Sequence, residues 1–343
     1  MTNWVLRLEG EQPSDNRYLA VQNLSTSASN VGFREINYIL YDDLANNSTR
    51  RAEIIEGLFS QVKPGDIVLL PFPLYILAMN FQKECIDFLK KMKNVKLIAF
   101  VLDLHTWLYK GDYNPKTDFL LEQLRTFDLL IVPTKKFAGR LKKEGVSTPM
   151  LSFDFLDFIY NGPIKTKNWK QKIYIASGRA ISLKNYHGKT DIVVIGSSNS
   201  TRENITVLPH RKAIELPQIF DGGFGAVDLI NNVTTNTNNY DWDSYSAYTS
   251  PSKLSLYLAS GLPVLVRSDS AVKELVERAG IGLIVDDLND IDRVFEKLNE
   301  NDYQKILKKV ATYQRAVSTG YFAQRALLEG VAFLTLGIND SIS

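Results

Sequence analysis

Short apolar runs that alternate with amphipathic stretches constrain the fold of this chain more than any other feature of its sequence. The runs 67–71, 96–102 and 129–132 have the pattern of buried strands, and the first follows a Pro-Gly-Asp turn. The stretches 81–92 and 135–143 carry apolar residues at helical spacing. Strands and helices in this order are typical of a parallel sheet covered on both faces. We therefore expect an α/β fold.

A polar break divides the chain. Asn161-Gly162-Pro163 and the charged stretch 165–172 are typical of a linker, and strand-like runs resume at 172–176 and 191–195. A chain of 343 residues is long enough for about two domains. We expect a first domain over 1–160, a second domain over 161–317 and a C-terminal helix over 318–343.

Composition excludes several classes of protein. Hydrophobic residues make up 45% of the chain and charged residues 23%, which is ordinary for a soluble globular protein and excludes disordered and fibrous chains. A net charge of +2 offers no strong field to nucleic acid or to an anionic membrane. The apolar runs are far shorter than the ~20 residues that span a bilayer, and the first residues lack the pattern of a signal peptide. One cysteine and three histidines leave little for a disulfide or a zinc site, so we expect a cytoplasmic protein without a metal.

The stretch 249–266 is the most informative for chemistry. Ser250 suits the N-cap of a helix and Pro251 suits its first position. The amides of residues 252–254 would then be free at the positive end of the helix dipole, and Lys253 adds a full charge beside them. A lysine in the first turn opposes the dipole, so an anionic ligand is the simplest compensation. The pattern predicts an anion site.

Other motifs are weaker or missing. The chain has neither Gly-x-Gly-x-x-Gly nor a P-loop, which argues against a dehydrogenase or a kinase. Three glycines in 222–225 precede a strand-like run and would serve either close approach to a ligand or a turn. Asp241-Trp242-Asp243 matches the Asp-x-Asp of metal-dependent transferases, but it lies in the Asn/Thr-rich run 231–245, which we read as a loop. We interpret this match as a coincidence.

Several segments together resemble a known group. Gly-Gly-Phe-Gly at 222–225, the helix and strand at 250–266, and the runs 272–277 and 280–285 resemble the second domain of GT-B glycosyltransferases. Within that fold, the chain is similar to the glucosyltransferases that add the second sugar to bacterial serine-rich-repeat adhesins, from 30–35 almost to its end. The resemblance implies two Rossmann-like domains, the first for the acceptor and the second for a nucleotide sugar held between them. It also implies that the last helix crosses back to the first domain.

The resemblance also implies the donor site. The diphosphate of a UDP-sugar would lie at the helix start, with Arg179 as a second cation. Asn16 would reach over the nucleotide from the first domain. His210 falls near a position close to the base, where the family usually has tyrosine. The residues expected to bind the nucleotide sugar are therefore Asn16, Arg179, His210, Pro251, Ser252, Lys253, Leu254 and Ser255.

Asp103 is the candidate general base. It ends the strand 96–102, at the edge from which parallel sheets present functional groups. Transfer with inversion needs a base within about 3 Å of the acceptor hydroxyl. His105 could replace Asp103 or orient the acceptor, and Trp107 and Tyr109 could stack on a sugar or pack on their own domain.

We therefore expect an inverting hexosyltransferase that moves glucose or GlcNAc from a UDP-sugar to a GlcNAc- or hexose-bearing Ser/Thr of a serine-rich-repeat adhesin, without a metal or a cofactor. Two alternatives remain open: a galactofuranosyl- or hexosyltransferase of surface polysaccharide synthesis, and a non-catalytic partner subunit that binds a UDP-sugar. We expect no nucleic acid partner, no stable membrane insertion and a homo-oligomer, either dimer or tetramer. The apolar stripe of 320–336 would anchor Tyr321, Phe322, Leu327 and Phe333 on the first domain or form the oligomer interface.

Overall fold

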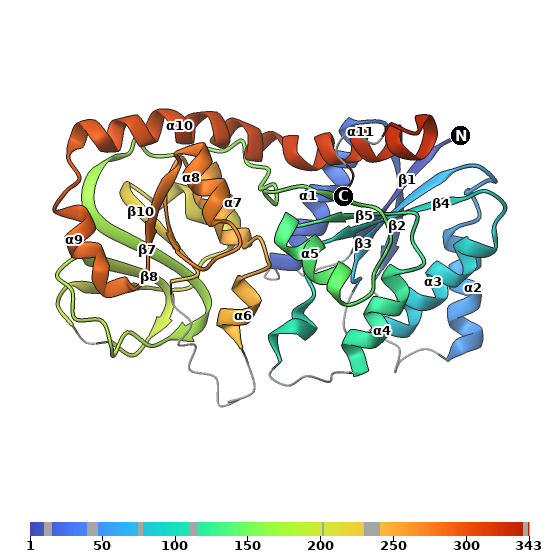
Figure 1. Ribbon diagram of the computed structural model, residues 1–343, viewed down its shortest axis with the longest axis horizontal. Coiled ribbons are helices and arrows are strands. Elements are labelled where there is room, and N and C mark those ends of the chain that lie inside the picture. The colour runs from blue at the N-terminus through green and yellow to red at the C-terminus, as the bar shows by residue number, and fades with distance from the viewer. Residues whose placement is uncertain are drawn as a thin grey trace. The chain divides into compact units, whose positions relative to one another are not determined.

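The chain folds into two compact units. A computed structural model describes residues 1–9, 16–39, 47–74, 78–109, 115–200, 202–229, 241–338 and 342. Unit 1 comprises Met1–Asp154 and Gly320–Ser343, and unit 2 comprises Phe155–Thr319. Within the described residues each unit holds one six-stranded sheet whose neighbouring strands are parallel (Figure 1). The two Rossmann-like halves predicted from the sequence are confirmed.

The sheet of unit 1 has the strand order β2-β1-β3-β4-β5-β6. Every residue of β3 and β5 is buried, which is expected where helices cover both faces of a parallel sheet. The strands are β1 (Asn3–Glu9), β2 (Phe33–Ile39), β3 (Ile67–Phe72), β4 (Lys96–Val101), β5 (Leu129–Val132) and β6 (Met150–Ser152).

Helices cover this sheet on both sides. In Figure 1, α1 and α11 lie on one side of the sheet of unit 1 and α2, α3 and α4 lie on the other. The helices are α1 (Asn16–Asn30), α2 (Ser48–Leu58), α3 (Met79–Lys91), the 3₁₀ helix η2 (His105–Leu108), α4 (Pro115–Leu124), α5 (Lys135–Lys143) and α11 (Tyr321–Leu336).

The C-terminal helix α11 returns to unit 1, as predicted. It packs on α1, β5 and β6. Phe322 and Leu327 are buried as expected, and Phe333 is half-buried. Tyr321 is 51% exposed, so it is not anchored on unit 1, and the other alternative, an oligomer interface, stays a prediction for this residue. The buried stripe begins one residue later, at Phe322, and Tyr321 lies at its margin.

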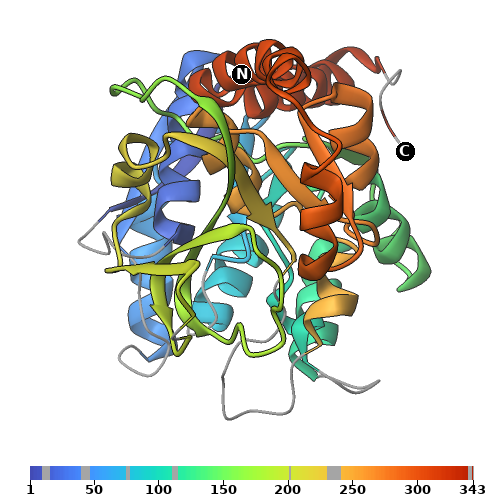
Figure 2. The ribbon, with the colours of Figure 1, turned by 90° about the vertical axis from the view of Figure 1, so that its left-hand side faces the viewer.

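The sheet of unit 2 has the strand order β12-β11-β10-β7-β8-β9. The long helix α10 packs on α7 and β7 and lies beside this sheet in both views (Figures 1 and 2). The strands are β7 (Asn168–Ile181), β8 (Asp191–Ser198), β9 (Ile205–Leu208), β10 (Gly222–Val227), β11 (Val264–Arg267) and β12 (Gly282–Val285). The helices are η3 (Ala213–Gln218), α6 (Trp242–Ser246), α7 (Ser252–Ala259), α8 (Lys273–Ala279), η4 (Leu288–Asp290), α9 (Ile291–Phe295) and α10 (Glu300–Thr319).

The polar stretch 165–172 is only partly a connection. β7 begins at Asn168, inside the stretch predicted as a linker. Trp169 packs edge-on against Phe295 at 5.2 Å between ring centroids. Lys167 is buried and donates hydrogen bonds to the carbonyls of Lys165 (2.7 Å) and Phe220 (2.9 Å). This polar sequence can form part of the sheet because Trp169 packs on the core and the ammonium of Lys167 has two hydrogen-bond acceptors.

The glycines of 222–225 serve packing within unit 2. They lie inside β10 and do not precede a strand, as the sequence had suggested. A Cβ on Gly222 would lie 2.0 Å from the carbonyl oxygen of Asn168, and one on Gly225 would lie 2.3 Å from the ring of Tyr257. Glycine is therefore needed where β10 approaches β7 and α7. Ligand approach is not required to explain these residues.

The strand order places a switch point in each sheet. In unit 1 the switch lies between β1 and β3: the chain goes from β1 outward to β2, and from β3 outward in the opposite direction to β4, β5 and β6. In unit 2 the switch lies between β7 and β10: the chain goes from β7 outward to β8 and β9, and from β10 outward in the opposite direction to β11 and β12. Open parallel sheets bind ligands at the carboxyl ends of the strands at such points. The residues that follow these strands are therefore the first place to look for a site.

Candidate functional site

The helix whose amino end is the predicted anion site is α7, and it begins one residue later than expected. Pro251 has a φ of −66° and a ψ of 133°, so it is extended and caps the helix, and Ser250 precedes the cap. The Leu254 amide donates to the Pro251 carbonyl (3.0 Å) and is not free, contrary to the prediction. Within the described ranges no acceptor faces the amides of Ser252 and Lys253. Two free amides remain at the positive end of the dipole.

Lys253 and Arg179 lie close enough to influence each other. Burial lowers the pKa of Lys253, Asp228 acts to raise it, and the charge of Arg179 lowers it further. The Lys253 ammonium has no ion pair or hydrogen bond with any residue that the structure describes. Arg179 is exposed near the carboxyl end of β7, and its amide donates to the Ser177 hydroxyl (3.2 Å). The structure thus brings together the two cations that the sequence had singled out, beside the switch point.

Ser255 lies in the same helix and is 1% exposed. Its Oγ has no hydrogen-bond partner in the described part of the chain. Buried hydroxyl groups normally have a partner. The Ser255 hydroxyl therefore lies in the same helix as the free amides without a described partner of its own, and its role in the site stays a prediction.

Asp228 completes this cluster, and the sequence analysis missed it. It follows β10 with a φ of 56°, in the left-handed region, and its Oδ2 accepts a hydrogen bond from the Ser270 hydroxyl (2.8 Å). Burial raises the pKa of Asp228 to about 6, although Ser270, Lys253 and Arg267 act to lower it. An acidic residue directly after a buried strand was the available signal, because the same signal pointed to Asp103.

A second polar contact supports the loop after β11. Arg267 donates from Nη2 to the Ser246 hydroxyl (3.1 Å), and the Ala271 amide donates to the Ser246 carbonyl (3.0 Å). These bonds tie α6 to the loop that carries Ser270. The loop that carries Ser270, which donates a hydrogen bond to Asp228, is therefore held in place by α6.

Asp103 and His105 lie at the carboxyl edge of the sheet of unit 1. Asp103 follows β4 and is half-buried, and His105 opens η2. Trp107 is buried, and its Nε1 donates to the Glu144 carboxylate (3.1 Å). The guanidinium of Arg140 lies 4.0 Å from the centre of its ring. Stacking of Trp107 on a sugar is therefore wrong, because this side chain fixes η2 on α5, whereas Tyr109 is 40% exposed.

Asn16 and His210 are the two other residues predicted for the site. Asn16 opens α1 after β1, at the switch point of unit 1, but its side chain lies outside the described residues. His210 is exposed and follows the edge strand β9, which β8 separates from β7. The structure records no interaction of His210 with Lys253 or Arg179 among the residues it describes.

The Asp-x-Asp match is partly helical. Of the run 231–245, residues 231–240 lie outside the described part, and Trp242–Ser246 forms α6. The Asp241 carboxylate accepts a hydrogen bond from the Ser244 amide (3.0 Å). One of the two acids of the match therefore has a structural role at the start of α6. The side chain of Asp243 is not described. No group of three metal-ligating residues is found in the ranges that the structure covers.

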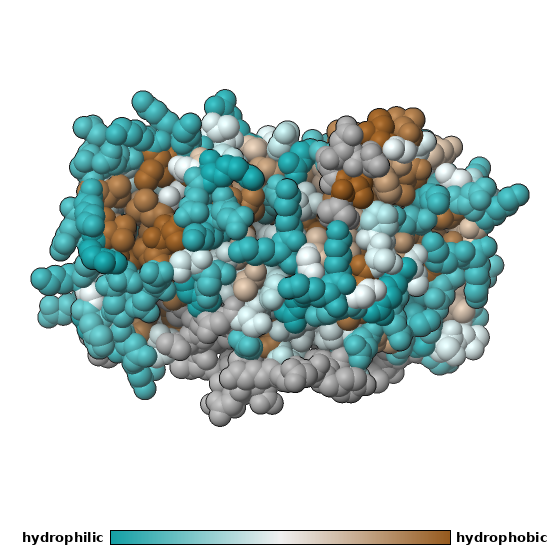
Figure 3. Space-filling view, in the orientation of Figure 1, coloured by the Kyte–Doolittle hydropathy of each residue, from teal (hydrophilic) through white to brown (hydrophobic). Residues whose placement is uncertain are grey.

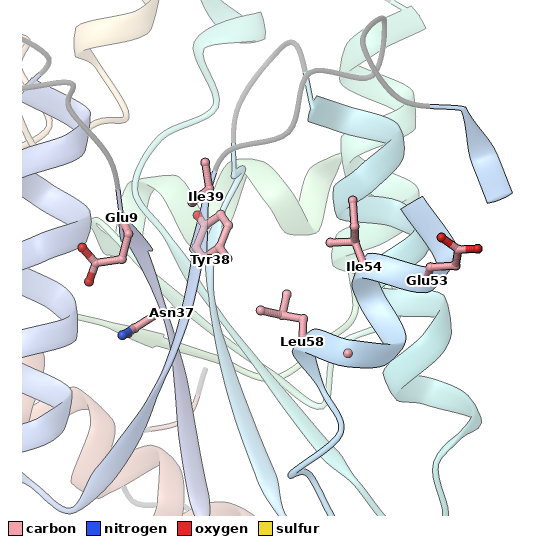
Figure 4. A pocket seen from close by; sticks show the side chains of 8 residues that line it. Glu9, Asn37, Tyr38, Ile39, Glu53, Ile54 and Leu58 are labelled. Carbon is pink, nitrogen blue, oxygen red and sulfur yellow. The ribbon is translucent and has the colours of Figure 1, made fainter. Parts of the chain in front are cut away.

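A separate groove lies in unit 1. It has a volume of about 480 Å³ and opens where β1 and β2 end beside α2 (Figure 4). Its lining combines carboxylates with apolar side chains: Glu9, Asn37, Tyr38, Ile39, Glu53, Ile54, Gly57 and Leu58. No predicted site residue lines this groove.

In the view of Figure 3 hydrophilic surface predominates, with brown apolar areas at the left, on unit 2, and over α11. Tyr321, Leu328 and Leu336 are exposed large hydrophobic residues of α11, and Ile338 just beyond it is exposed as well. None of the described helices is long and apolar enough to cross a membrane.

Comparison with known proteins gives consistent matches along the chain. The family model "Glucosyltransferase 3-like, N-terminal domain" matches residues 2–155, and "Glucosyltransferase 3-like, C-terminal domain" matches residues 173–330. Two curated relatives are both named Glucosyltransferase 3. The Streptococcus gordonii protein is 23% identical over 334 residues, covering 95% of this chain and 97% of the relative. The Streptococcus parasanguinis protein is 22% identical over 336 residues, covering 96% and 98%.

Solved structures are similar in fold. "Trehalose-6-phosphate from E. coli bound with UDP-2-fluoro glucose" superposes with a TM-score of 0.59 at 10% identity, covering 96% of this chain and 99% of that one. At this identity the likeness concerns the fold alone. It confirms the predicted α/β GT-B architecture.

Proposed function

Because this chain belongs to the Glucosyltransferase 3-like family, we propose that it is a hexosyltransferase that uses a UDP-sugar as donor. The observation that carries this proposal is the pair Lys253 and Arg179 beside the free amides of α7. Two like charges held near a helix amino end are unfavourable without an anion. Asp228 supplies one negative charge to this cluster, and a diphosphate would supply the further negative charge that the two cations can bind.

The same groups would assist the chemistry. Breaking the bond between the sugar and UDP builds negative charge on the diphosphate. Fixed cations and backbone amides stabilise such charge most where water is scarce. Lys253, Arg179 and the amides of Ser252 and Lys253 would therefore stabilise the leaving group, and Ser255 would add a hydroxyl. No metal and no cofactor enters this scheme.

Asp103 is the proposed base. It would accept the proton of the acceptor hydroxyl, and the oxygen would then displace UDP with inversion at the sugar carbon. His105 is the alternative base or a group that orients the acceptor. In this scheme unit 2 binds the donor through the residues around α7, and unit 1 supplies the base.

The donor sugar and the acceptor are part of the same proposal. We propose glucose or GlcNAc as the transferred sugar, and the name Glucosyltransferase 3 of both curated relatives supports glucose. The proposed acceptor is a GlcNAc- or hexose-bearing Ser/Thr of a serine-rich-repeat adhesin, and the protein is proposed to act in the cytoplasm as a homo-oligomer. A galactofuranose donor would point to surface polysaccharide synthesis instead.

A donor panel tests this function. The chain would be incubated with UDP-glucose, UDP-GlcNAc, UDP-galactose and UDP-galactofuranose and a GlcNAc-bearing Ser/Thr peptide, with mass spectrometry as the readout and UDP affinity measured by calorimetry. Lys253→Ala should weaken UDP binding about 10–100-fold, since hydrogen bonds to charged groups contribute about 1.5–3 kcal/mol. Lys135→Ala, an exposed lysine that opens α5, serves as the matched control. A wild-type chain that binds no UDP and transfers no sugar contradicts the proposal.

A further inference from the structure

The outer face of α5 in unit 1 is strongly basic and has no part in the proposed donor site. The inner face of this helix packs on β5 and β6, and no acidic residue lies within the helix. Arg125 adds a positive charge at its carboxyl end, where the guanidinium donates to the carbonyls of Glu144 (2.8 Å) and Gly145 (3.1 Å). The exposed residues of α5 are all lysines, and we call them the lysine face: Lys135, Lys136, Lys142 and Lys143.

Helix stability does not explain this set of lysines. Lys142 and Lys143 suit the negative carboxyl end of the helix dipole, but Lys135 and Lys136 lie in the first turn, where a positive charge is unfavourable. Lys135, Lys142 and Lys143 make no ion pair or hydrogen bond with any residue in the described ranges. Their charges are therefore available to a partner.

A glycine lies at the centre of the lysine face. Positions three and four residues to either side of Gly139 are its neighbours on the helix surface, and these are positions 135, 136, 142 and 143. A Cβ on Gly139 would have no heavy atom of the described chain within 4 Å, so packing does not require glycine here. Glycine also weakens a helix interior relative to alanine. The absent side chain leaves room for another chain to approach the helix backbone between the four ammonium groups.

The helix α5 also holds the segment that carries the proposed base. The ring of Trp107 in η2 packs against Phe137 with 4.6 Å between ring centroids, and the Arg140 guanidinium lies 4.0 Å from its centre. The Glu144 carboxylate accepts hydrogen bonds from Trp107 Nε1 (3.1 Å) and Arg140 Nε (3.0 Å). Residues 103–105, which include the proposed base, directly precede this anchor. The lysine face therefore belongs to the helix on which the proposed acceptor segment is fixed.

Charge and position together select the partner. An acidic chain complements the lysine face, and unit 1 is the unit that supplies the base in the proposed function. A membrane fits less well, because helices that lie on a membrane bury an apolar face in it, and none of the exposed side chains of α5 is apolar.

We propose that the lysine face of α5 binds an acidic segment of the acceptor peptide, so that acceptors with Asp or Glu beside the glycosylated residue are favoured. Each exposed ion pair contributes little, but several of them act together on one peptide. The same charges steer an acidic acceptor toward unit 1. This inference rests on the proposed function, since it assigns the acceptor to unit 1. It adds the sequence class of the acceptor, which the proposed function leaves open.

Two synthetic peptides test this inference. Both carry one GlcNAc-bearing serine, and they differ only in the flanking residues, which are Asp and Glu in one peptide and Asn and Gln in the other. Fluorescence anisotropy measures their binding to the full chain. At about 50 mM salt the acidic peptide should bind about 5–20-fold more tightly, because several exposed ion pairs add up. The difference should nearly disappear at about 0.5 M salt, since screening shortens the range of these charges.

Variants of two lysines assign the preference to α5. Lys142→Gln combined with Lys143→Gln should weaken binding of the acidic peptide about 3–5-fold and leave the neutral peptide unchanged. Lys142→Arg combined with Lys143→Arg keeps both charges and should retain the preference. The matched control is Lys308→Gln combined with Lys309→Gln, which removes two adjacent exposed lysines of α10 in unit 2 and should behave as the wild type. UDP affinity should stay at its wild-type value in all three variants.

Three results would overturn the inference. Equal binding of the two peptides at low salt would mean that the lysine face does not select acidic acceptors. An equal loss of preference in the Lys308 and Lys309 variant would mean that the charge of the whole chain attracts the peptide. Lysine-dependent binding to vesicles of phosphatidylcholine and phosphatidylserine, without any preference between the peptides, would make a membrane the partner. Failure of the proposed function looks different, because the wild type would then transfer no sugar to either peptide, while anisotropy would still report the preference for the acidic one.

Discussion

Asp103 and His105 lie two residues apart at the carboxyl end of β4, so only substitution separates their contributions to proton transfer. If Asp103 is the base, Asp103→Asn should lower kcat about 10²–10⁴-fold, the range for loss of a general base. UDP affinity should not change, because the donor cations lie in unit 2. His105→Gln should reduce kcat far less. The assay is transfer to a glycopeptide at saturating donor, and the reverse order of effects would make His105 the base.

Asp221 is a residue whose charge stabilises the fold and not the site. Its carboxylate accepts hydrogen bonds from Lys170 (2.7 Å) and the Tyr174 hydroxyl (2.6 Å). Burial alone would raise the pKa of Asp221, but these bonds outweigh it and lower the pKa to about 2. Because the folded pKa lies below the unfolded value near 3.9, the stabilisation is complete above about pH 4 and disappears as pH falls toward 2.

Asp221→Asn should therefore lower the free energy of unfolding by about 1 kcal/mol at pH 7, after allowance for screening of a partly exposed group. Denaturant titrations of the wild type and the variant should converge as the pH is lowered toward 2. Asp191→Asn, at the exposed start of β8, should change stability by less than about 0.5 kcal/mol. A difference that persists unchanged at low pH would contradict the assignment.

The strand β10 and the helix α7 pack so closely that position 225 has no room for a side chain. A Cβ there would lie 2.3 Å from the ring of Tyr257, whose hydroxyl accepts the Ala176 amide (3.0 Å) and donates to the Tyr174 carbonyl (3.2 Å). Gly225→Ala must therefore displace α7 or β10 and should cost about 1–3 kcal/mol, the usual range for overpacking. It should also weaken UDP binding, because α7 carries Lys253.

Gly139→Ala is the matched control. Gly139 lies in α5 with no heavy atom within 4 Å of an added Cβ, so alanine should raise stability by up to about 1 kcal/mol through helix propensity. Thermal unfolding of the two variants should shift in opposite directions. Unchanged stability in Gly225→Ala would mean that the contact between α7 and β10 relaxes without cost.

Elements with a clear hydrophobic period were predictable, because an element that buries one face needs apolar residues at the spacing of that face. The strand 129–132 and the helix 135–143 agree with β5 and α5. β7 was placed too late, since its first residues are polar and only Trp169 enters the core. Trp107 could not be assigned for a different reason. The sequence around a large aromatic residue in a connection does not show whether its side chain contacts a ligand or packs on its own unit.

The candidate site was predictable where it is contiguous. Lys253 and its neighbours lie on one short helix, so spacing alone placed them together. Asp228 could not be assigned from spacing, because a long segment that includes α6 separates it from α7 in the sequence, and β10 and α7 become neighbours only in the folded unit. Sequence spacing does not reveal which strand neighbours which.

At the scale of the whole molecule, the chain leaves unit 1 after Asp154 and returns to it at Gly320. Gly320 has a φ of 79°, and a Cβ there would lie 2.3 Å from the Ser27 hydroxyl oxygen, so the passage from α10 to α11 requires glycine. α11 then packs closely on β5, since a Cβ on Gly330 would lie 2.7 Å from Leu129. The last helix in the sequence is thus part of the core of the first unit.

Two adjacent leucines of α11 test this. Leu327 is fully buried and Leu328 is 55% exposed. Leu327→Ala should cost about 2–5 kcal/mol, as for other buried leucines, whereas Leu328→Ala should change stability by less than about 0.5 kcal/mol. Hydrogen exchange should accelerate in α1, β5 and β6 of the Leu327 variant, because these elements contact α11. The amides of β7 and β10 should keep their wild-type rates. Equal acceleration in both units would mean that they open as one cooperative body, and α11 would then stabilise the molecule as a whole.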